Sequence, residues 1–287
     1  MKRILTIQDV SCVGKCSLTV ALPVISAAQV EACVLPTAVL STHTMFKHYT
    51  FVDLTDEIVP TVECWKQEGI TFDAIYTGYL GSFQQMEIIE NLVDDFRTDD
   101  SFFFLDPVLG DAGRLYARFD QKFVDRMALF CRKADVITPN MTEATAMLHI
   151  PYVEPCFSEE FVKDVLRRLA DLGPKIVALT GVQYQKGKIG VAGFDSTQNE
   201  FFTYLHDEYP GRYHGTGDLF ASAAVAALAR GRSIPDSFRI AAEFTADSIR
   251  YTNANSNPRS YGVDFENALP AFIRQFEDFS LNGTAHK

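Results

Sequence analysis

Several features are missing from this chain of 287 residues, and each absence removes a class of function. No apolar run is long enough to cross a bilayer, and the apolar run near the N-terminus is too short for a signal peptide, so we expect no membrane association. Basic residues are scarce: 26 Lys and Arg stand against 37 Asp and Glu, and the net charge of −11 argues against a nucleic-acid binder. A nucleotide ligand is still allowed, because backbone N–H groups and metal ions can bind phosphates locally.

The six cysteines (positions 12, 16, 33, 64, 131 and 156) show neither zinc-site spacing nor a paired disulfide framework. We therefore expect free thiols and a cytoplasmic location. Cys12 and Cys16 flank a Gly-Lys pair and could be reactive, but small buried side chains are the favoured interpretation. The chain also lacks a linker rich in Pro, Gly or Ser, an internal repeat and a low-complexity segment, which predicts a single domain over residues 1–287.

Short β-branched and aromatic runs alternate with longer helical patterns. The predicted strands are 3–8, 32–39, 73–77, 101–106, 134–138, 175–181, 188–194 and 200–206. The predicted helices are 16–29, 54–68, 83–96, 120–132, 141–149, 158–172, 215–230, 234–252 and 264–278. This alternation predicts an α/β fold with a central, mostly parallel sheet and helices on both faces. The last two strands predict a small antiparallel hairpin near one edge.

The most informative stretch is Gly215-Thr216-Gly217-Asp218, which directly precedes a helix of small residues. Glycines let the backbone approach an anion closely, and a helix start presents free N–H groups and the positive end of a dipole to a phosphate. Asp218 follows at a position where a carboxylate could accept a proton from an attacking hydroxyl. The alternative is an ordinary glycine-rich loop in which the aspartate caps the helix.

Polar clusters follow the first six predicted strands, at 9–16, 41–44, 77–81, 106–111, 138–143 and 180–182. Ligands of such sheets bind beyond the carboxyl ends of the strands, so we expect these clusters on one rim. The first cluster nearly matches a P-loop, but Asp9 replaces the first glycine and Cys16 replaces the hydroxyl residue that binds magnesium. A turn that carries polar groups into a pocket is the favoured interpretation. Asp106, Glu143 and Asp218, together with nearby hydroxyls, suit Mg²⁺ and phosphate oxygens.

Together these motifs resemble those of the pyridoxal kinases in the ribokinase-like superfamily, over residues 4–230. They are Ile7-Gln8, Thr42-His43-Thr44, Thr77-Gly78-Tyr79, 106–111, 134–140 with Glu143, and 215–220. The last motif marks the superfamily, and the ordered set marks its vitamin B6 branch. The resemblance implies ATP-dependent phosphorylation of the 5′-hydroxymethyl group of pyridoxal, pyridoxamine or pyridoxine, with homodimers common in the family.

The resemblance also implies roles around the nucleotide. Asp218 would be the catalytic base, and the backbone of Gly215, Thr216 and Gly217 would form the anion hole. The remaining nucleotide-side residues would be Asp106 and Glu143 as metal ligands, Asn140 beside them, Thr138, Thr180 and Thr216 on the phosphates, and Asp111 and Tyr116 in a lid. Mg²⁺ and a monovalent cation such as K⁺ would lie around ATP.

On the vitamer side, the resemblance implies that Tyr79 stacks on the pyridine ring while His43 and Thr44 line its pocket. Asp9 departs from the pattern, because a serine that bonds the substrate would be expected there. Asp9 with Ser11 resembles instead the hydroxymethylpyrimidine kinases of thiamine synthesis, which stay an alternative. A non-catalytic pyridoxal phosphate carrier is a second alternative, against which the intact Asp218 argues. The polar loop at 253–262 has no assigned role.

Overall fold

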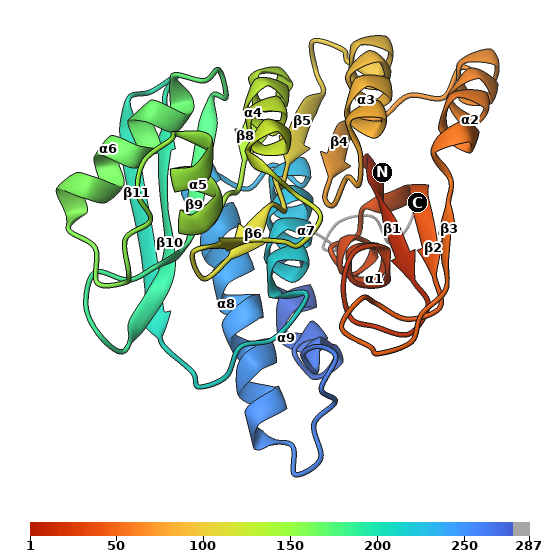
Figure 1. Ribbon diagram of the computed structural model, residues 1–287. Coiled ribbons are helices and arrows are strands. Elements are labelled where there is room, and N and C mark those ends of the chain that lie inside the picture. Colours follow the sequence, from red (N-terminus) through yellow and green to blue (C-terminus); the bar gives the residue numbers. More distant parts are fainter. Residues whose placement is uncertain (278–287) are drawn as a thin grey trace, which may run out of the picture.

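The centre of the fold is a nine-stranded sheet in the order β11-β10-β9-β8-β5-β4-β1-β2-β3, shown in Figure 1. The structure is a computed structural model that describes residues 1–277. The strands are β1 (Arg3–Ser11), β2 (Glu31–Leu40), β3 (Phe51–Asp53), β4 (Ala74–Thr77), β5 (Phe102–Leu105), β8 (Val136–Ile137), β9 (Ile176–Val182), β10 (Lys188–Asp195) and β11 (Glu200–Asp207). The six strands from β9 to β2 in this order pair in parallel, whereas β10, β11 and β3 pair antiparallel.

Helices cover both faces of the sheet, which confirms the predicted fold class. They are α1 (Leu18–Ala27), α2 (Thr55–Gln67), α3 (Phe83–Phe96), α4 (Gln121–Phe130), α5 (Met141–Met147), α6 (Glu159–Ala170), α7 (Thr216–Ala229), α8 (Ile234–Ala254) and α9 (Leu269–Arg274). Buried side chains of α2 to α6 form one apolar core with the sheet, and those of α1, α7, α8 and α9 form another on the opposite face. No helix within residues 1–277 is long and apolar enough to cross a bilayer.

The α7 helix lies deepest in the second core. Its alanines at 221, 223, 224, 226 and 227 are almost fully buried. Small side chains let helices and sheet approach closely, and close packing holds the helix rigidly. The rigid helix carries the glycine motif at its N-terminal end, so that motif is fixed relative to the sheet.

The structure differs from the sequence-based expectation at several element ends. Strand β1 continues to Ser11, past an irregularity in its pairing with β2 between Gln8 and Val10, so Asp9 belongs to the strand rather than to the turn after it. Strand β3 adds an antiparallel strand at the second edge, and the predicted strand 134–138 shortens to two residues. The predicted helix 264–278 is a 3₁₀ turn at Phe265–Asn267 followed by α9, and residue 278 lies outside the described residues.

Two short strands, β6 (Gly110–Asp111) and β7 (Arg114–Leu115), form a separate antiparallel ribbon beyond the end of β5. The ribbon is attached to α5, because the Gly113 N–H donates to the Thr142 hydroxyl at 2.9 Å. It contains Asp111 and is followed directly by Tyr116, the two residues expected in a lid.

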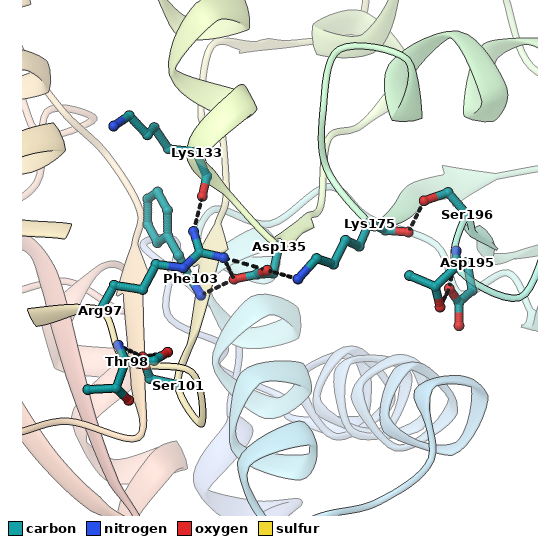
Figure 2. A network of polar contacts seen from close by, with 10 residues as sticks. Arg97, Thr98, Ser101, Phe103, Lys133, Asp135, Lys175, Asp195 and Ser196 are labelled. Atoms are coloured by element: carbon teal, nitrogen blue, oxygen red, sulfur yellow. Dashed lines mark hydrogen bonds and ion pairs between the residues drawn. The ribbon is translucent and has the colours of Figure 1, made fainter. Parts of the chain in front are cut away.

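A polar network fixes the opposite end of the central strands (Figure 2). Asp135, directly before β8, is buried and accepts hydrogen bonds from the Arg97 guanidinium at 2.7 Å and the Phe103 N–H at 2.9 Å. The Lys175 ammonium, before β9, lies 2.9 Å from the same carboxylate. One carboxylate therefore ties together β5, β8, the start of β9 and the end of α3. The far ends of these strands carry the residues described next.

Candidate active site

A cavity of about 390 Å³ opens at the carboxyl ends of the central strands. Among the residues that line it are eleven that the sequence analysis singled out: Asp106, Asp111, Tyr116, Thr138, Asn140, Glu143, Thr180, Gly215, Thr216, Gly217 and Asp218. These residues come from five different segments of the chain, and the parallel strand order brings them to one rim. Asp9, Ser11, His43, Thr44 and Tyr79 are not part of this lining.

The glycine motif shapes the start of α7. Gly215 has φ 77°, and a Cβ atom there would collide with the carbonyl oxygen of Lys15. Only glycine fits this position, because the positive φ disfavours other residues and there is no space for a Cβ atom. No side chain caps the helix, so its first N–H groups remain available for an anion at the cavity. The Thr216 hydroxyl donates to the Tyr213 carbonyl at 3.1 Å and holds the preceding turn.

Asp218 lies in the first turn of α7 at the cavity. Burial raises the pKa of its carboxyl to about 6; the backbone N–H of Ser17 opposes this shift and the Asp9 charge adds to it. A carboxyl with this pKa is mostly ionised at pH 7. Its pKa is also close enough to the working pH for the carboxylate to accept a proton efficiently. Asp218 therefore has the position and the acidity of a general base.

Two further acids face the cavity. Burial, with the charges of Glu143 and Asp218, holds the pKa of Asp106 well above its usual range. Glu143 is also buried, and its carboxylate accepts hydrogen bonds from the Leu109 N–H at 2.8 Å and the Asn140 N–H at 2.9 Å. Asn140 returns the contact by capping α5, and its amide donates to the Gly110 carbonyl at 2.8 Å. Glu143 and Asn140 thus also hold the ribbon β6–β7 in place.

The donor set at this point fits a cation only in part. No group of three or more His, Cys, Asp or Glu side chains within residues 1–277 is arranged to hold a metal ion. Mg²⁺, however, often takes one or two carboxylates and completes its shell with phosphates and water. The raised pKa of Asp106 shows a site where negative charge is poorly compensated. Asp106 and Glu143 can therefore supply the protein ligands of a nucleotide-bound Mg²⁺.

A second polar cluster lies beside Asp218, at the end of β1. Asp9 is buried and accepts hydrogen bonds from the Ser17 hydroxyl at 2.6 Å and the Ser11 hydroxyl at 3.1 Å. Burial raises the pKa of Asp9, while the two serines oppose that shift. The Ser17 backbone N–H also lowers the pKa of the Asp218 carboxyl, so Ser17 lies beside both acids. Ser17 therefore connects the second cluster to Asp218.

The other residues expected around the vitamer differ in how far they are buried. His43 is buried and stacks on His214 with ring centroids 5.9 Å apart, and its Nδ1 accepts from the Met45 N–H at 3.1 Å. Tyr79 is partly buried against Phe119, 5.7 Å away between ring centroids, and the Asp9 charge contributes to its raised pKa after burial itself. Thr44 is exposed. Tyr79 and Thr44 stay predictions as substrate contacts.

Some cavity residues were not anticipated. Arg212 is the only lysine or arginine among the described residues that line the cavity, which also holds four carboxylates. Helix α8 contributes Ala242, Thr245 and Ile249, an apolar part suited to a flat ring. The spacing of these three marks one helix face and could have been found in the sequence. Nothing in the sequence around Arg212 or Ser17 marks either as a site residue, since each matters through a segment far along the chain.

The fold and the cavity together define a kinase of the ribokinase-like type. A glycine-lined helix start, a base in its first turn and buried acids opposite meet at one end of a doubly covered sheet. The sequence profile of the phosphomethylpyrimidine kinase family matches residues 20–262. The chain therefore belongs to that family.

Three known proteins are similar over nearly the whole chain. A Bacteroides thetaiotaomicron protein described as a phosphomethylpyrimidine kinase, crystallised with pyridoxal, is 40% identical with a TM-score of 0.89, covering 94% of this chain and 95% of that one. Pyridoxal kinase from Lactobacillus plantarum is 31% identical with a TM-score of 0.87, covering 96% and 98%. The PdxY pyridoxal kinase of Pasteurella multocida is 26% identical, covering 90% and 91%. These relatives confirm the resemblance to pyridoxal kinases inferred from the motifs.

Proposed function

We propose that this protein transfers the γ-phosphoryl group of ATP to the 5′-hydroxymethyl group of a vitamin B6 vitamer. The observation that carries the proposal is the position of Asp218, which lines the large cavity and also lies near enough to the Asp9 cluster for the Asp9 charge to raise its pKa. A phosphoryl transfer needs the acceptor hydroxyl and the γ-phosphate to meet in line next to a residue that can take the proton, and Asp218 stands where ATP in the cavity and an acceptor beside Asp9 would meet. The kinship with pyridoxal kinases and with a protein crystallised with pyridoxal supports a vitamer as the acceptor.

In this proposal the cavity holds ATP. The free N–H groups at Gly215, Thr216 and Gly217 bind the transferring phosphoryl group, and the apolar face of α8 packs on the base. Asp106 and Glu143 hold Mg²⁺, which neutralises phosphate charge. Asp218 accepts the proton of the vitamer hydroxyl while its oxygen forms the new bond to phosphorus and the bond to ADP breaks. Catalysis rests on positioning and on stabilising charge.

The vitamer ring lies on the Asp9 side of Asp218, with Tyr79 and His43 as its expected neighbours. Asp9 and Ser11 also support the hydroxymethylpyrimidine kinase alternative, because a buried carboxylate can accept from the amino group of an aminopyrimidine. The family description names that activity as well. The pyridoxal found with the Bacteroides relative favours the vitamer.

We further propose that the enzyme works as a cytoplasmic homodimer. All six cysteines are free, as expected for a reducing compartment. The three residues of edge strand β3 are exposed, including Phe51 and Val52, and Val34 on neighbouring β2 is exposed as well. Exposed apolar side chains at one sheet edge suit an interface between two copies. Size-exclusion chromatography with light scattering tests this directly.

A coupled assay of ADP release tests the proposed reaction. Purified protein receives MgATP and, in separate runs, pyridoxal, pyridoxamine, pyridoxine or hydroxymethylpyrimidine. We expect turnover with at least one vitamer at a higher kcat/KM than with hydroxymethylpyrimidine, and turnover at least about 100-fold slower with Asp218→Asn at the same concentration. The opposite ranking would make the pyrimidine the substrate, and ligand binding without ADP release would identify a carrier.

A further inference from the structure

Two segments remain without a role: the loop that resembles a P-loop, and the polar loop at 253–262. The structure brings them together. The Lys15 N–H donates to the carbonyl of Tyr261 at 3.3 Å, and a Cβ at Gly262 would collide with the Lys15 side chain. The lysine of the P-loop-like stretch therefore packs against the C-terminal loop, and it is not among the residues that line the cavity.

The Lys15 ammonium is held by two carboxylates from the far end of the chain. It lies 3.2 Å from an Asp264 oxygen and 2.8 Å from a Glu266 oxygen, and only 15% of its side chain is exposed. It also lies 5.6 Å from the centre of the Phe265 ring. A lysine with this little exposure and two ion pairs is fixed in one position, unlike a surface lysine.

Asp264, the more buried of the two carboxylate partners, is itself fixed by further hydrogen bonds. Asp264 accepts from the Asn255 amide at 2.7 Å, and its N–H donates at 2.7 Å to the hydroxyl of Thr252, which is fully buried in α8. Asp264 thus links Lys15, in the loop after β1, to Thr252 near the C-terminal end of α8. The Lys15–Asp264 ion pair is therefore partly buried and anchored to the core, unlike an isolated surface ion pair.

The same loop contacts the catalytic motif on its other side. The Lys15 carbonyl oxygen fills the space beside Gly215. Ser17, two residues on, donates its hydroxyl to Asp9 at 2.6 Å, and its backbone N–H lies near enough to Asp218 to lower the pKa of that carboxyl. Ser17 has φ 49°, which is unusual for a residue other than glycine and persists only where the surroundings enforce it.

We propose that Lys15 is a positioning residue, which holds the 12–17 loop against Asp264 and Glu266 so that the Lys15 carbonyl stays against Gly215 and Ser17 stays bonded to Asp9 beside Asp218. Lys15 acts through these two contacts and does not bind phosphate. The inference deepens the proposed function, on which it rests.

Lys15→Met tests the inference, with Lys66→Met as the matched control. Lys66 also pairs with two carboxylates, Glu63 and Asp95, each at 2.9 Å, but on the surface of α2. We expect Lys15→Met to lower kcat by about 10- to 100-fold, because small displacements of a reacting group have effects of that size. KM for ATP should change by less than about twofold, since no phosphate contact is lost. Lys15→Arg should restore most of kcat, and Lys66→Met should leave it unchanged.

Two further measurements keep the outcome clear. Glu266→Gln removes the more exposed partner, so it should lower kcat in the same direction even if Lys15→Met folds poorly. Hydrogen–deuterium exchange should show faster exchange in Lys15→Met for peptides covering 12–18 and 215–218, with α3 and α6 unchanged. This second readout needs no substrate, so it decides the inference even if no vitamer is phosphorylated and the proposed function fails.

Three results would overturn the inference. The first is a wild-type kcat in both Lys15→Met and Glu266→Gln. The second is a raised KM for ATP at unchanged kcat, which would make Lys15 a phosphate ligand after all. The third is unchanged exchange at 12–18 and 215–218, which would leave Lys15 with no influence on the base.

Discussion

Replacing Asp218 by Asn is expected to separate activity from stability in this protein. The amide keeps the size of the side chain but cannot accept the proton of the attacking hydroxyl. We expect kcat to fall about 10²- to 10⁴-fold, the usual contribution of a positioned base, with ATP binding largely retained. In the wild type, kcat should rise with pH and level off above about pH 6, because burial raises the pKa of Asp218 to about 6.

The same substitution should make the folded state more stable at neutral pH. The Asp218 pKa rises in the folded protein from an ordinary 3.8 to about 6. Between about pH 4 and pH 6 the folded protein keeps a proton on Asp218 that the unfolded chain has lost. The free energy of unfolding therefore falls as the pH rises through this range, and the full destabilisation is present above about pH 6. Two pKa units correspond to about 3 kcal/mol, which we reduce to about 1–3 kcal/mol because the side chain is partly exposed.

Thermal unfolding of both proteins checks this reasoning. At pH 7.5 the Tm of Asp218→Asn should exceed that of the wild type by about 2–5 °C for a chain of this size. The difference should shrink as the pH falls from about 6 to about 4 and should vanish below that, where the wild-type carboxyl is protonated in both the folded and the unfolded state. A variant with lower Tm at pH 7.5 would show that the carboxylate stabilises the fold, and a near wild-type kcat would remove Asp218 as the base.

Further predictions concern the anion hole, the metal and the acceptor. Gly215→Ala should lower kcat by more than tenfold, measured with intact secondary structure by circular dichroism, because its Cβ would displace the Lys15 carbonyl. Asp106→Asn and Glu143→Gln should raise the Mg²⁺ concentration needed for half-maximal activity; unchanged Mg²⁺ titrations would make both acids structural. Tyr79→Ala should raise KM for the vitamer more than KM for ATP, since stacking contributes about 1 kcal/mol, whereas lost stability at constant KM would assign it to the core. Asp9→Ser should shift relative kcat/KM toward pyridoxal over pyridoxamine and hydroxymethylpyrimidine, and an unchanged ranking would show that Asp9 does not contact the ring.

The order of helices and strands could be predicted because it depends on local patterns. Strand β4 is a fully buried run, and α7 from Leu219 to Ala229 is an unbroken series of small and apolar residues. The error at 264–278 has a local cause: Phe265, Ala268 and Phe272 suggest one helix, but Pro270 lacks an N–H and can only stand in the first turn of a new one.

The candidate site could be predicted only where a residue follows its own strand. Asp106 and Thr138 stand directly after β5 and β8, and the parallel topology places such residues together. Ser17 and Arg212 could not be found this way, because their importance comes from contacts with segments far along the chain. Lys15 received no role from the sequence, where its stretch only nearly matched a P-loop, because its partners Asp264 and Glu266 are 249 and 251 residues away.

This long separation has a consequence for how the protein is made. Synthesis proceeds from the N-terminus, so the first strand and the loop that follows it leave the ribosome long before Asp264 and Glu266 exist. Parallel pairing of β1 with β2 and β4 can form early, but the support behind Ser17 has to wait for the final tenth of the chain. A chain that stops before Asp264 can therefore pair β1 with β2 and β4 but lacks both carboxylates that hold Lys15. If Lys15 positions the loop as proposed, we expect such a truncated chain to be inactive even where its sheet forms.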